Sequence, residues 1–263
     1  MTRNLIIGAV AIAVSAAMLA GGFLAGSRQP PTSTAASIPT DRAQVERIVR
    51  DYLVANPEIM LEVQTALESR QQERQREDQR ATIDAASDDI FNASYDGVIG
   101  NPEGSLTVVE FFDYNCGYCK RALSDMETMV ESNPDLRFVL KEFPILGPDS
   151  QEAHVVSMAF RALSPENYAE FHRRLLGGEG RAGEARAMEI ALSFGVEEEA
   201  LRAEMQNPEI MQAFARTYEL ADSLAITGTP SYVVGDEVVF GALGVEVLGE
   251  KLANVRECQS ASC

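Results

Sequence analysis

Two cysteines that lie three positions apart, Cys116 and Cys119, are the residues of this sequence best suited to chemistry. They follow the apolar run 106–112 (LTVVEFF), which predicts a buried strand, and they open a segment whose apolar residues have helical spacing. A thiol at a helix N-terminus faces unpaired N–H groups and the positive end of the helix dipole, and both favour the thiolate. We therefore predict that Cys116 is an exposed nucleophile and that Cys119, one turn later, resolves a mixed disulfide.

The same two cysteines could instead form an inert structural disulfide or half of a zinc site. Zinc would need two further ligands at close spacing, and the sequence places none nearby. We therefore predict no metal site and no cofactor. An alternative from another functional class is a non-catalytic envelope chaperone, or a protein that sequesters copper with soft thiol ligands.

Glu110 is a carboxylate inside the predicted strand, between Val109 and Phe111. Burying it is costly unless it is protonated, paired or functional. Lys141, on the neighbouring predicted strand, is a candidate ion partner, and the alternative is that Glu110 points to an exposed edge. Asp113, just after the strand, is predicted to be a loop or capping residue.

The elements around the cysteines predict an α/β domain. A strand, a helix and a second strand in this order imply two parallel strands joined by a crossover helix. A long Ala/Glu/Leu-rich stretch then predicts a helical subdomain, and a hairpin and a helix follow it. The predicted elements are strands 106–112 and 136–143, a helix at 117–130, a helical subdomain from Pro144 to about Ile226, a hairpin of 231–234 and 238–240, and a final helix at 245–255.

The segment 108–119 (VVEFFDYNCGYC) resembles the active-site strand and helix of the Dsb thiol–disulfide oxidoreductases, which have a thioredoxin fold. The helical stretch before Thr229 and Pro230 resembles the helical insertion of that family, and the likeness covers about residues 98–257. It implies an α/β thioredoxin fold with a helical subdomain inserted at about 145–226, preceded here by an N-terminal α-helical segment.

The resemblance also implies roles for single residues. It implies a cis peptide bond before Pro230, with the proline facing the cysteine pair, and it places Thr229, Pro230 and Tyr118 on the substrate-binding face. It places Glu110 beneath the disulfide, where a raised pKa of its carboxyl would assist proton transfer to or from Cys119.

The N-terminal residues predict export from the cytosol. Residues 1–27 carry a positive start and the almost wholly apolar run 5–26, so they form either a cleaved signal peptide or a membrane anchor. Both outcomes place the protein in the bacterial envelope, most naturally the periplasm, where paired thiols can be oxidised. Residues 28–40 are rich in Pro, Ser, Thr and Ala and are predicted to be a linker.

Residues 41–97 are predicted to be helical, with apolar stripes at 45–53 and 59–67. These stripes are too short to form a core alone, so they either pack on the downstream domain or join copies of the chain. We favour a homo-oligomer formed through residues 41–92. The segment resembles the N-terminal oligomerisation regions of envelope isomerases, including trimeric suppressor-of-copper-sensitivity relatives.

The residues between the cysteines bear on the direction of the reaction. Gly117 and Tyr118 there, and Thr229 before the proline, resemble the isomerase branch of the family, so we favour an isomerase or reductase over an oxidase. The expected partners are unfolded or misoxidised envelope proteins and a membrane redox partner. The formal net charge of −18 argues against a nucleic-acid partner.

The remaining cysteines and histidines are predicted to have structural roles. Cys258 and Cys263 lie in the polar tail 258–263 and can bond to each other, bridge two chains or stay free; we favour the mutual bond. His154 and His172 are predicted to pack or lie at the surface, because the sequence shows no Ser or carboxylate constellation around them.

Overall fold

The computed structural model describes residues 41–263, so the predicted targeting segment 1–27 and linker 28–40 lie outside the described residues. The chain divides into two compact units, and the boundary falls between Ala66 and Leu67. Within the described part of the chain, no helix is both long enough and apolar enough to cross a membrane.

The N-terminal unit is helical, as predicted. Helix α2 (Arg42–Ala55) begins after Asp41, whose side chain accepts a hydrogen bond from the Ala43 N–H and so caps the helix. Helix α3 (Glu58–Ala85) begins in this unit. Among residues 41–263 nothing buries the apolar stripe of α2, and these members of it stay exposed: Val45, Ile48, Val49 and Tyr52.

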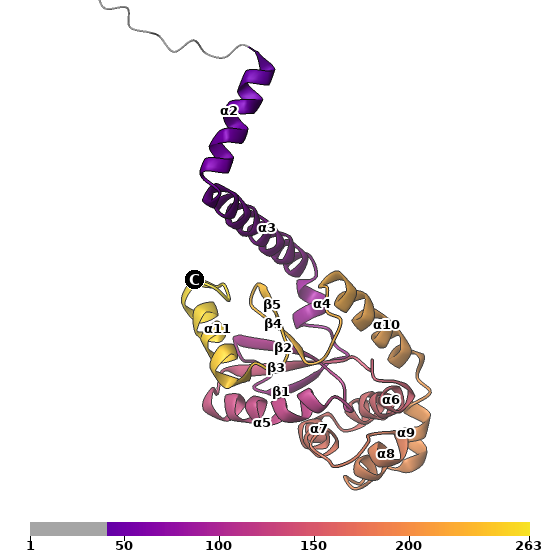
Figure 1. Ribbon diagram of the computed structural model, residues 1–263. Helices are drawn as coiled ribbons and strands as arrows, with labels where there is room; N and C mark the ends of the chain where they lie inside the picture. The colour runs from indigo at the N-terminus through magenta and orange to yellow at the C-terminus, as the bar shows by residue number, and fades with distance from the viewer. Residues whose placement is uncertain (1–40) are drawn as a thin grey trace, which may run out of the picture. The chain divides into compact units, whose positions relative to one another are not determined.

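The second unit contains one mixed sheet of five strands in the order β1-β3-β2-β4-β5 (Figure 1). The two central strands, β2 and β3, are parallel and are joined by helix α5, which confirms the predicted crossover. The short edge strand β1, antiparallel to β3, was not predicted. The elements are β1 (Gly97–Gly100), β2 (Leu106–Phe112), α5 (Gly117–Ser132), β3 (Leu136–Glu142), β4 (Ser231–Val234) and β5 (Glu237–Phe240).

A run of helices between β3 and β4 forms the predicted helical subdomain, and the fold class is the one that the resemblance implied. A last helix packs on α5, β2 and β4. The helices are α4 (Ser87–Phe91) before the sheet, α6 (Pro148–Leu163), the 3-10 turn η1 (Pro165–Asn167), α7 (Tyr168–Leu176), α8 (Glu184–Leu192), α9 (Glu198–Glu204) and α10 (Pro208–Ser223) within the subdomain, and α11 (Gly244–Cys258) at the end.

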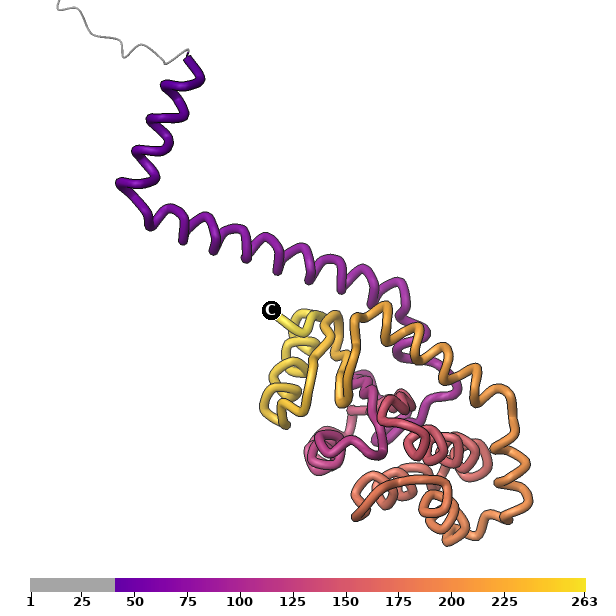
Figure 2. Tube along the Cα trace, turned by 45° about the vertical axis from the view of Figure 1, so that its right-hand side comes forward, coloured from indigo at the N-terminus to yellow at the C-terminus, as the bar shows by residue number. Residues whose placement is uncertain are grey.

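The two faces of the sheet carry two apolar clusters. Because side chains alternate along a strand, Val108 and Phe112 of β2 belong to one cluster, together with α5 and α11, while Val109 and Phe111 belong to the other. The second cluster includes α4 and the end of α10, which lie side by side in both views (Figure 2). Glu110 therefore shares its face of the sheet with Val108, Phe112 and helix α5.

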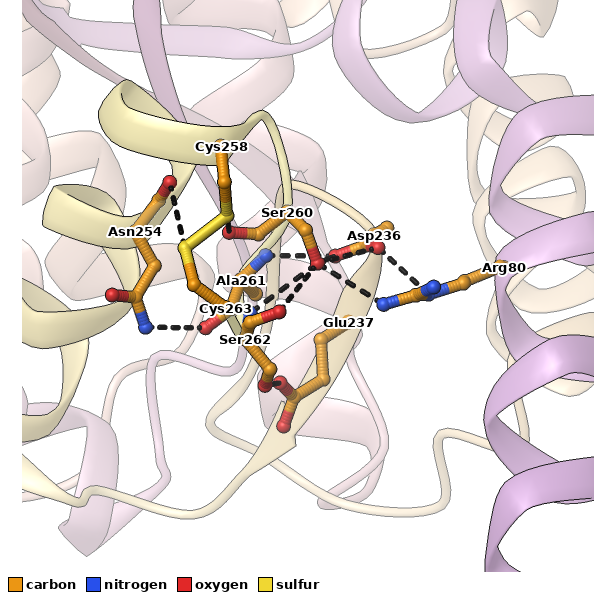
Figure 3. Close-up of a disulfide and its surroundings, with 9 residues drawn as sticks. All are labelled: Arg80, Asp236, Glu237, Asn254, Cys258, Ser260, Ala261, Ser262 and Cys263. Carbon is orange, nitrogen blue, oxygen red and sulfur yellow. Dashed lines mark hydrogen bonds and ion pairs between the residues drawn. A yellow bond between two sulfur atoms is a disulfide. The ribbon is translucent and has the colours of Figure 1, made fainter.

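A disulfide between Cys258 and Cys263 closes the C-terminal turn, as we favoured (Figure 3). The Asp236 carboxylate, in the β4–β5 turn, accepts hydrogen bonds from the Ala261 N–H at 2.8 Å and from the Ser260 hydroxyl. It also pairs with Arg80 of α3 at 2.8 Å. The closed turn is thereby fixed to the hairpin and to the C-terminal half of α3.

Candidate active site

The two cysteines lie where the sequence predicted them, at the junction of β2 and α5. Cys116 is the N-cap of α5, and its sulfur accepts a hydrogen bond from the Cys119 N–H at 3.4 Å. Both residues are free thiols. Cys116 is only 5% exposed, so the prediction that this residue is exposed was wrong. The cause is a loop distant in sequence, because the Thr229 carbonyl oxygen lies 3.2 Å from the Cys116 sulfur.

The two thiols differ sharply in acidity. The pKa of Cys116 is lowered to about 5, chiefly by the hydrogen bond with the Cys119 side chain; burial opposes this, and hydrogen bonds with Thr229 and with the N–H groups of the first turn add to it. The pKa of Cys119 is raised far above its ordinary value, mainly by burial. At neutral pH the pair therefore holds one thiolate, on Cys116, and one thiol.

The loop opposite the cysteines contains a cis peptide bond between Thr229 and Pro230, as the resemblance implied. Pro230 is buried, and its carbonyl oxygen accepts a hydrogen bond from the Gly241 N–H at 2.9 Å, which ties the loop to the end of β5. Tyr118, between the cysteines, is 60% exposed and lies under the Arg121 guanidinium, 4.1 Å from the ring centre. The structure brings Cys116 and Thr229 into contact and leaves the Tyr118 ring facing solvent.

Glu110 is buried in the centre of the sheet, with 1% of its surface exposed. Neither carboxylate oxygen has a hydrogen-bond partner within the described part of the chain. Burial, and secondly the negative charge of Cys116, raise the pKa of the Glu110 carboxyl to about 8. The alternative of an exposed edge position is excluded, and Glu110 carries a proton at neutral pH.

Lys141 is not the partner of Glu110, which corrects the sequence prediction. In the β2–β3 register Lys141 lies opposite Phe111, whereas Glu110 lies opposite Leu140. Side chains that are neighbours in register share a face of the sheet, so Lys141 points to the other side. There it is fully buried and pairs with the Asp96 carboxylate.

Asp113 and Asn115 hold the loop before Cys116. The buried Asp113 carboxylate accepts hydrogen bonds from the N–H groups of Asn115, Ile145 and Leu146 and from the Ser150 hydroxyl, which agrees with the predicted loop role. Asn115 was not predicted to have a role, because no local pattern singles it out. Its side chain bonds both the N–H and the carbonyl of Ala182, each at 2.8 Å, and Ala182 lies 67 residues further along the chain.

A buried polar cluster lies behind this loop, and it corrects the statement that no carboxylate surrounds the histidines. The Tyr114 N–H donates to Nε2 of His154, so the other ring nitrogen, Nδ1, carries the proton and donates to the Glu142 carboxylate. Ser157 and Tyr168 donate to the same carboxylate. Since every member is buried, the cluster packs the subdomain against the sheet, which fits the structural role predicted for His154.

Across residues 41–263 no group of three or more His, Cys, Asp or Glu side chains is arranged to hold a metal ion.

Comparison with protein families gives two matches. Residues 107–253 match the family model of the DSBA-like thioredoxin domain. Residues 41–74 match the model of the Copper resistance protein ScsC N-terminal domain.

Solved structures agree with the first match. A thioredoxin-like oxidoreductase from Silicibacter pomeroyi is 39% identical, with a TM-score of 0.61, and the match covers 65% of this chain and 98% of that one. The thiol-disulfide exchange protein alpha-DsbA2 from Wolbachia pipientis is 26% identical over 69% and 98%, with a TM-score of 0.64. Proteus mirabilis ScsC in a transitional conformation is 28% identical over 85% and 100%, with a TM-score of 0.60.

Two curated relatives are Na⁺/H⁺ antiporters. NhaA 3 of Salinispora tropica is 23% identical over 153 residues, and NhaA 1 of Salinispora arenicola is 25% identical over 154 residues. Each match covers 58% of this chain, and the chain spans about a quarter of the length of these relatives, 24%.

Proposed function

The chain belongs to the DSBA-like thioredoxin domain family and is a thiol–disulfide oxidoreductase, and we propose that Cys116 and Cys119 carry its exchange with protein disulfides. The Cys116 thiolate attacks one sulfur of a substrate disulfide, forming a mixed disulfide and releasing one substrate thiolate. Cys119 then loses its proton and attacks the Cys116 sulfur, which releases the second substrate thiolate. The substrate is reduced by two electrons and the cysteine pair is oxidised; the reverse sequence oxidises a substrate.

The unequal acidity of the two thiols is the observation that carries this proposal. A pKa of about 5 keeps Cys116 ionised at the pH of the envelope, whereas the buried Cys119 stays protonated until it is needed. The test is reduction of insulin by the protein in the presence of dithiothreitol. Loss of activity in Cys116→Ser, with trapping of a mixed disulfide in Cys119→Ser, is expected; turnover by Cys116→Ser would contradict the assignment.

Glu110 is proposed to accept and return the Cys119 proton. Its carboxyl is buried, has no hydrogen-bond partner in the structure, and interacts electrostatically with both cysteines. A pKa of about 8 lies close to neutral pH, which is where a group that both gives and takes a proton works best.

The substrate-binding face is proposed to consist of Tyr118, Thr229 and Pro230. Three large apolar residues stay exposed in or near the loops around Cys116 and Pro230. Tyr118 lies between the two cysteines, Leu146 donates its N–H to Asp113, and Leu243 follows Gly241, whose N–H bonds the Pro230 carbonyl. Exposed apolar surface beside a reactive thiolate suits unfolded or misoxidised envelope proteins.

Isomerisation or reduction is proposed ahead of oxidation, with a membrane redox partner returning the cysteine pair to its working state. An isomerase needs a reduced Cys116, which its low pKa stabilises, but the same feature favours a strong oxidant. The deciding experiment combines a redox titration with reactivation of scrambled ribonuclease. Protein that oxidises reduced ribonuclease and never reactivates the scrambled form would be an oxidase.

Residues 41–92 are proposed to form a homo-oligomer in the periplasm, with residues 5–26 as export signal or anchor. The match of residues 41–74 to an ScsC N-terminal domain supports this, as does the uncovered apolar stripe of α2. Val49→Arg is expected to lower the mass measured by analytical ultracentrifugation. An unchanged mass would show that the stripe is not the contact.

Copper binding by the two thiols is the second candidate, because the matched N-terminal family is described as a copper resistance protein. Thiolates are soft ligands that suit Cu(I). Tight Cu(I) binding to Cys116 and Cys119 together with no reduction of insulin would favour this function over exchange.

A further inference from the structure

A basic pocket of about 450 Å³ lies beside helix α5, lined by residues of α5, α7 and α8. Helix α7 packs on both of the other two helices (Figure 1). The charged residues of its wall are Arg173, Arg174, Arg186, Glu127 and Glu189, and part of the remaining wall is apolar, including Leu123.

Arg186 is the arginine of this pocket that has neither an ion pair nor a hydrogen bond among residues 41–263. Arg173 pairs with Glu170 and lies 3.9 Å from Glu127, and Arg174 donates to the Ser193 hydroxyl. Arg186, in contrast, forms no ion pair or hydrogen bond with any of residues 41–263, and its Nε is buried without a partner. A guanidinium with a buried, unpaired N–H is a ready donor to an incoming carboxylate.

A second cation lies next to Arg186. The Lys120 ammonium donates to the carbonyls of Gly178 and Gly180, at 2.9 and 3.0 Å. The Arg186 guanidinium lies against the same glycine, since a β-carbon on Gly178 would be 2.5 Å from its Nη2. Burial and then the charge of Arg186 lower the pKa of Lys120. The two cations thus repel each other, and neither forms an ion pair with a carboxylate among residues 41–263, although the net charge of the chain is −18.

The pocket is joined to the cysteine pair by the loop between α7 and α8. Gly177 and Gly178 line the pocket, and Ala182 of the same loop is bonded on both backbone groups to Asn115, the residue before Cys116. An extended chain spans about 3.3 Å per residue. Leu123, which lines the pocket, lies seven residues after Cys116 on α5, about 10 Å along the helix axis, so a substrate segment bonded to Cys116 would reach the pocket within about four extended residues of its own cysteine.

We propose that the pocket around Arg186 receives an acidic side chain of the protein substrate while the substrate cysteine is bonded to Cys116. This rests on the proposed exchange at Cys116 and names the substrate class that it favours. An Asp or Glu side chain supplies the planar carboxylate that a guanidinium binds through two hydrogen bonds, and its methylene groups suit the apolar part of the wall. The position of the pocket beside the thiolate favours a group carried by the substrate chain over a free anion.

The test compares two synthetic peptides that differ in one residue. Each carries one cysteine as a mixed disulfide with 2-mercaptoethanol, and either Glu or Gln about four residues from that cysteine. The rate constant of thiol exchange with the reduced, full-length protein is measured at low salt. The Glu peptide is expected to react about fivefold faster, the effect of roughly 1 kcal/mol for one partly buried ion pair.

The variants assign the preference to one side chain. Arg186→Gln is expected to bring the ratio of the two rate constants to about one. Because both rate constants are measured on the same variant, a partial loss of folded protein cancels from the ratio. Arg202→Gln is the charge-matched control, since Arg202 pairs with Glu184 and Glu198 at an exposed site, and it is expected to keep the ratio.

Three results would overturn the inference. The first is equal rate constants for the two peptides with the natural protein. The second is a loss of the preference for the Glu peptide in Arg202→Gln as large as that in Arg186→Gln. The third is a preference that persists in Arg186→Gln and in the presence of inorganic phosphate as a competitor. Exchange with neither peptide would instead overturn the proposed function at Cys116, and this inference with it.

Discussion

The proton on Glu110 and the negative charge on Cys116 are coupled through the interior of the protein. Burial is the larger cause of the raised pKa of Glu110, about 8, and the Cys116 thiolate adds to it. Glu110 therefore stays protonated while Cys116 is an anion. When Cys116 becomes part of a mixed disulfide its charge disappears and the pKa of Glu110 falls, so a larger fraction of Glu110 is in the carboxylate form that can accept the Cys119 proton at that stage of the reaction.

The first prediction concerns the titration of Cys116. Alkylation by iodoacetamide should increase with pH to a plateau with a midpoint near pH 5, where the thiolate forms. Cys119→Ala should move this midpoint toward 9.0, the ordinary value, because the hydrogen bond with Cys119 is the largest cause of the shift. A midpoint unchanged in Cys119→Ala would mean that the N–H groups of the helix start alone stabilise the anion.

The same shift makes the stability of the reduced protein depend on pH. The folded-state pKa of Cys116 lies below its ordinary value, so the contribution is fully present above pH 9.0 and is lost as the pH falls through about 5. The oxidised protein lacks this thiol. The reduced form should therefore gain free energy of unfolding relative to the oxidised form as the pH rises from 5 to 9, as measured by urea unfolding of both forms.

The second prediction concerns Glu110→Gln. The pKa of Glu110 is raised, so folding favours the protonated carboxyl. Its contribution to the free energy of unfolding is therefore fully present below pH 4.5 and is lost as the pH rises through about 8. The uncharged variant should lose this slope. Its second exchange step, attack by Cys119, should slow by roughly 100-fold, the lower range for loss of a general base. Stopped-flow decay of the mixed disulfide measures that step, and an unchanged rate would remove Glu110 from the mechanism.

The sequence predicted what depends on neighbours along the chain. The run 106–112 and the helix that starts at Gly117 have strong local patterns, and both were found where expected. Strand β1 (Gly97–Gly100) was missed because four residues with a glycine at each end have little strand pattern of their own; its pairing with β3 defines it. The low exposure of Cys116 depends on Thr229, 113 residues away, and the face that Lys141 occupies depends on strand register. No local pattern contains either fact.

The third prediction tests the corrected role of Lys141. Lys141→Met leaves the buried Asp96 carboxyl without its partner, so the free energy of unfolding should fall by about 3–5 kcal/mol at neutral pH. Burial already raises the pKa of Asp96 to about 7, so adding Asp96→Asn to Lys141→Met should recover part of the loss. Urea unfolding of the two variants decides this, and the pH slope assigned to Glu110 should persist in both. If the pH dependence of stability assigned to Glu110 disappeared in Lys141→Met, Lys141 would be the partner of Glu110, contrary to the strand register.

The fourth prediction concerns the hydrogen bonds of Asn115. Asn115→Ala leaves the N–H and the carbonyl of Ala182 without partners, which should cost about 1–3 kcal/mol of unfolding free energy. Because these bonds fix the loop next to Cys116, exchange with a peptide disulfide should change as well. Asn254→Ala is the matched control, since its side-chain amide donates to the Ala261 carbonyl, far along the chain from Cys116 and Cys119. Equal effects of both variants on exchange would show that Asn115 does not position the loop.

The fifth prediction concerns the C-terminal disulfide. Replacing Cys258 and Cys263 by serine opens a loop of few residues, so the loss of unfolding free energy should be about 2 kcal/mol, the small value expected for a short closed loop. The turn that the disulfide closes presents Ser260 and Ala261 to Asp236, which also pairs with Arg80 (Figure 3). Arg80→Gln should therefore lower the free energy of unfolding less in the serine variant than in the natural chain. The four unfolding curves form a double-mutant cycle. Strict additivity would show that the disulfide does not hold Asp236 in place, and a changed alkylation rate at Cys116 would show that the turn affects the redox pair.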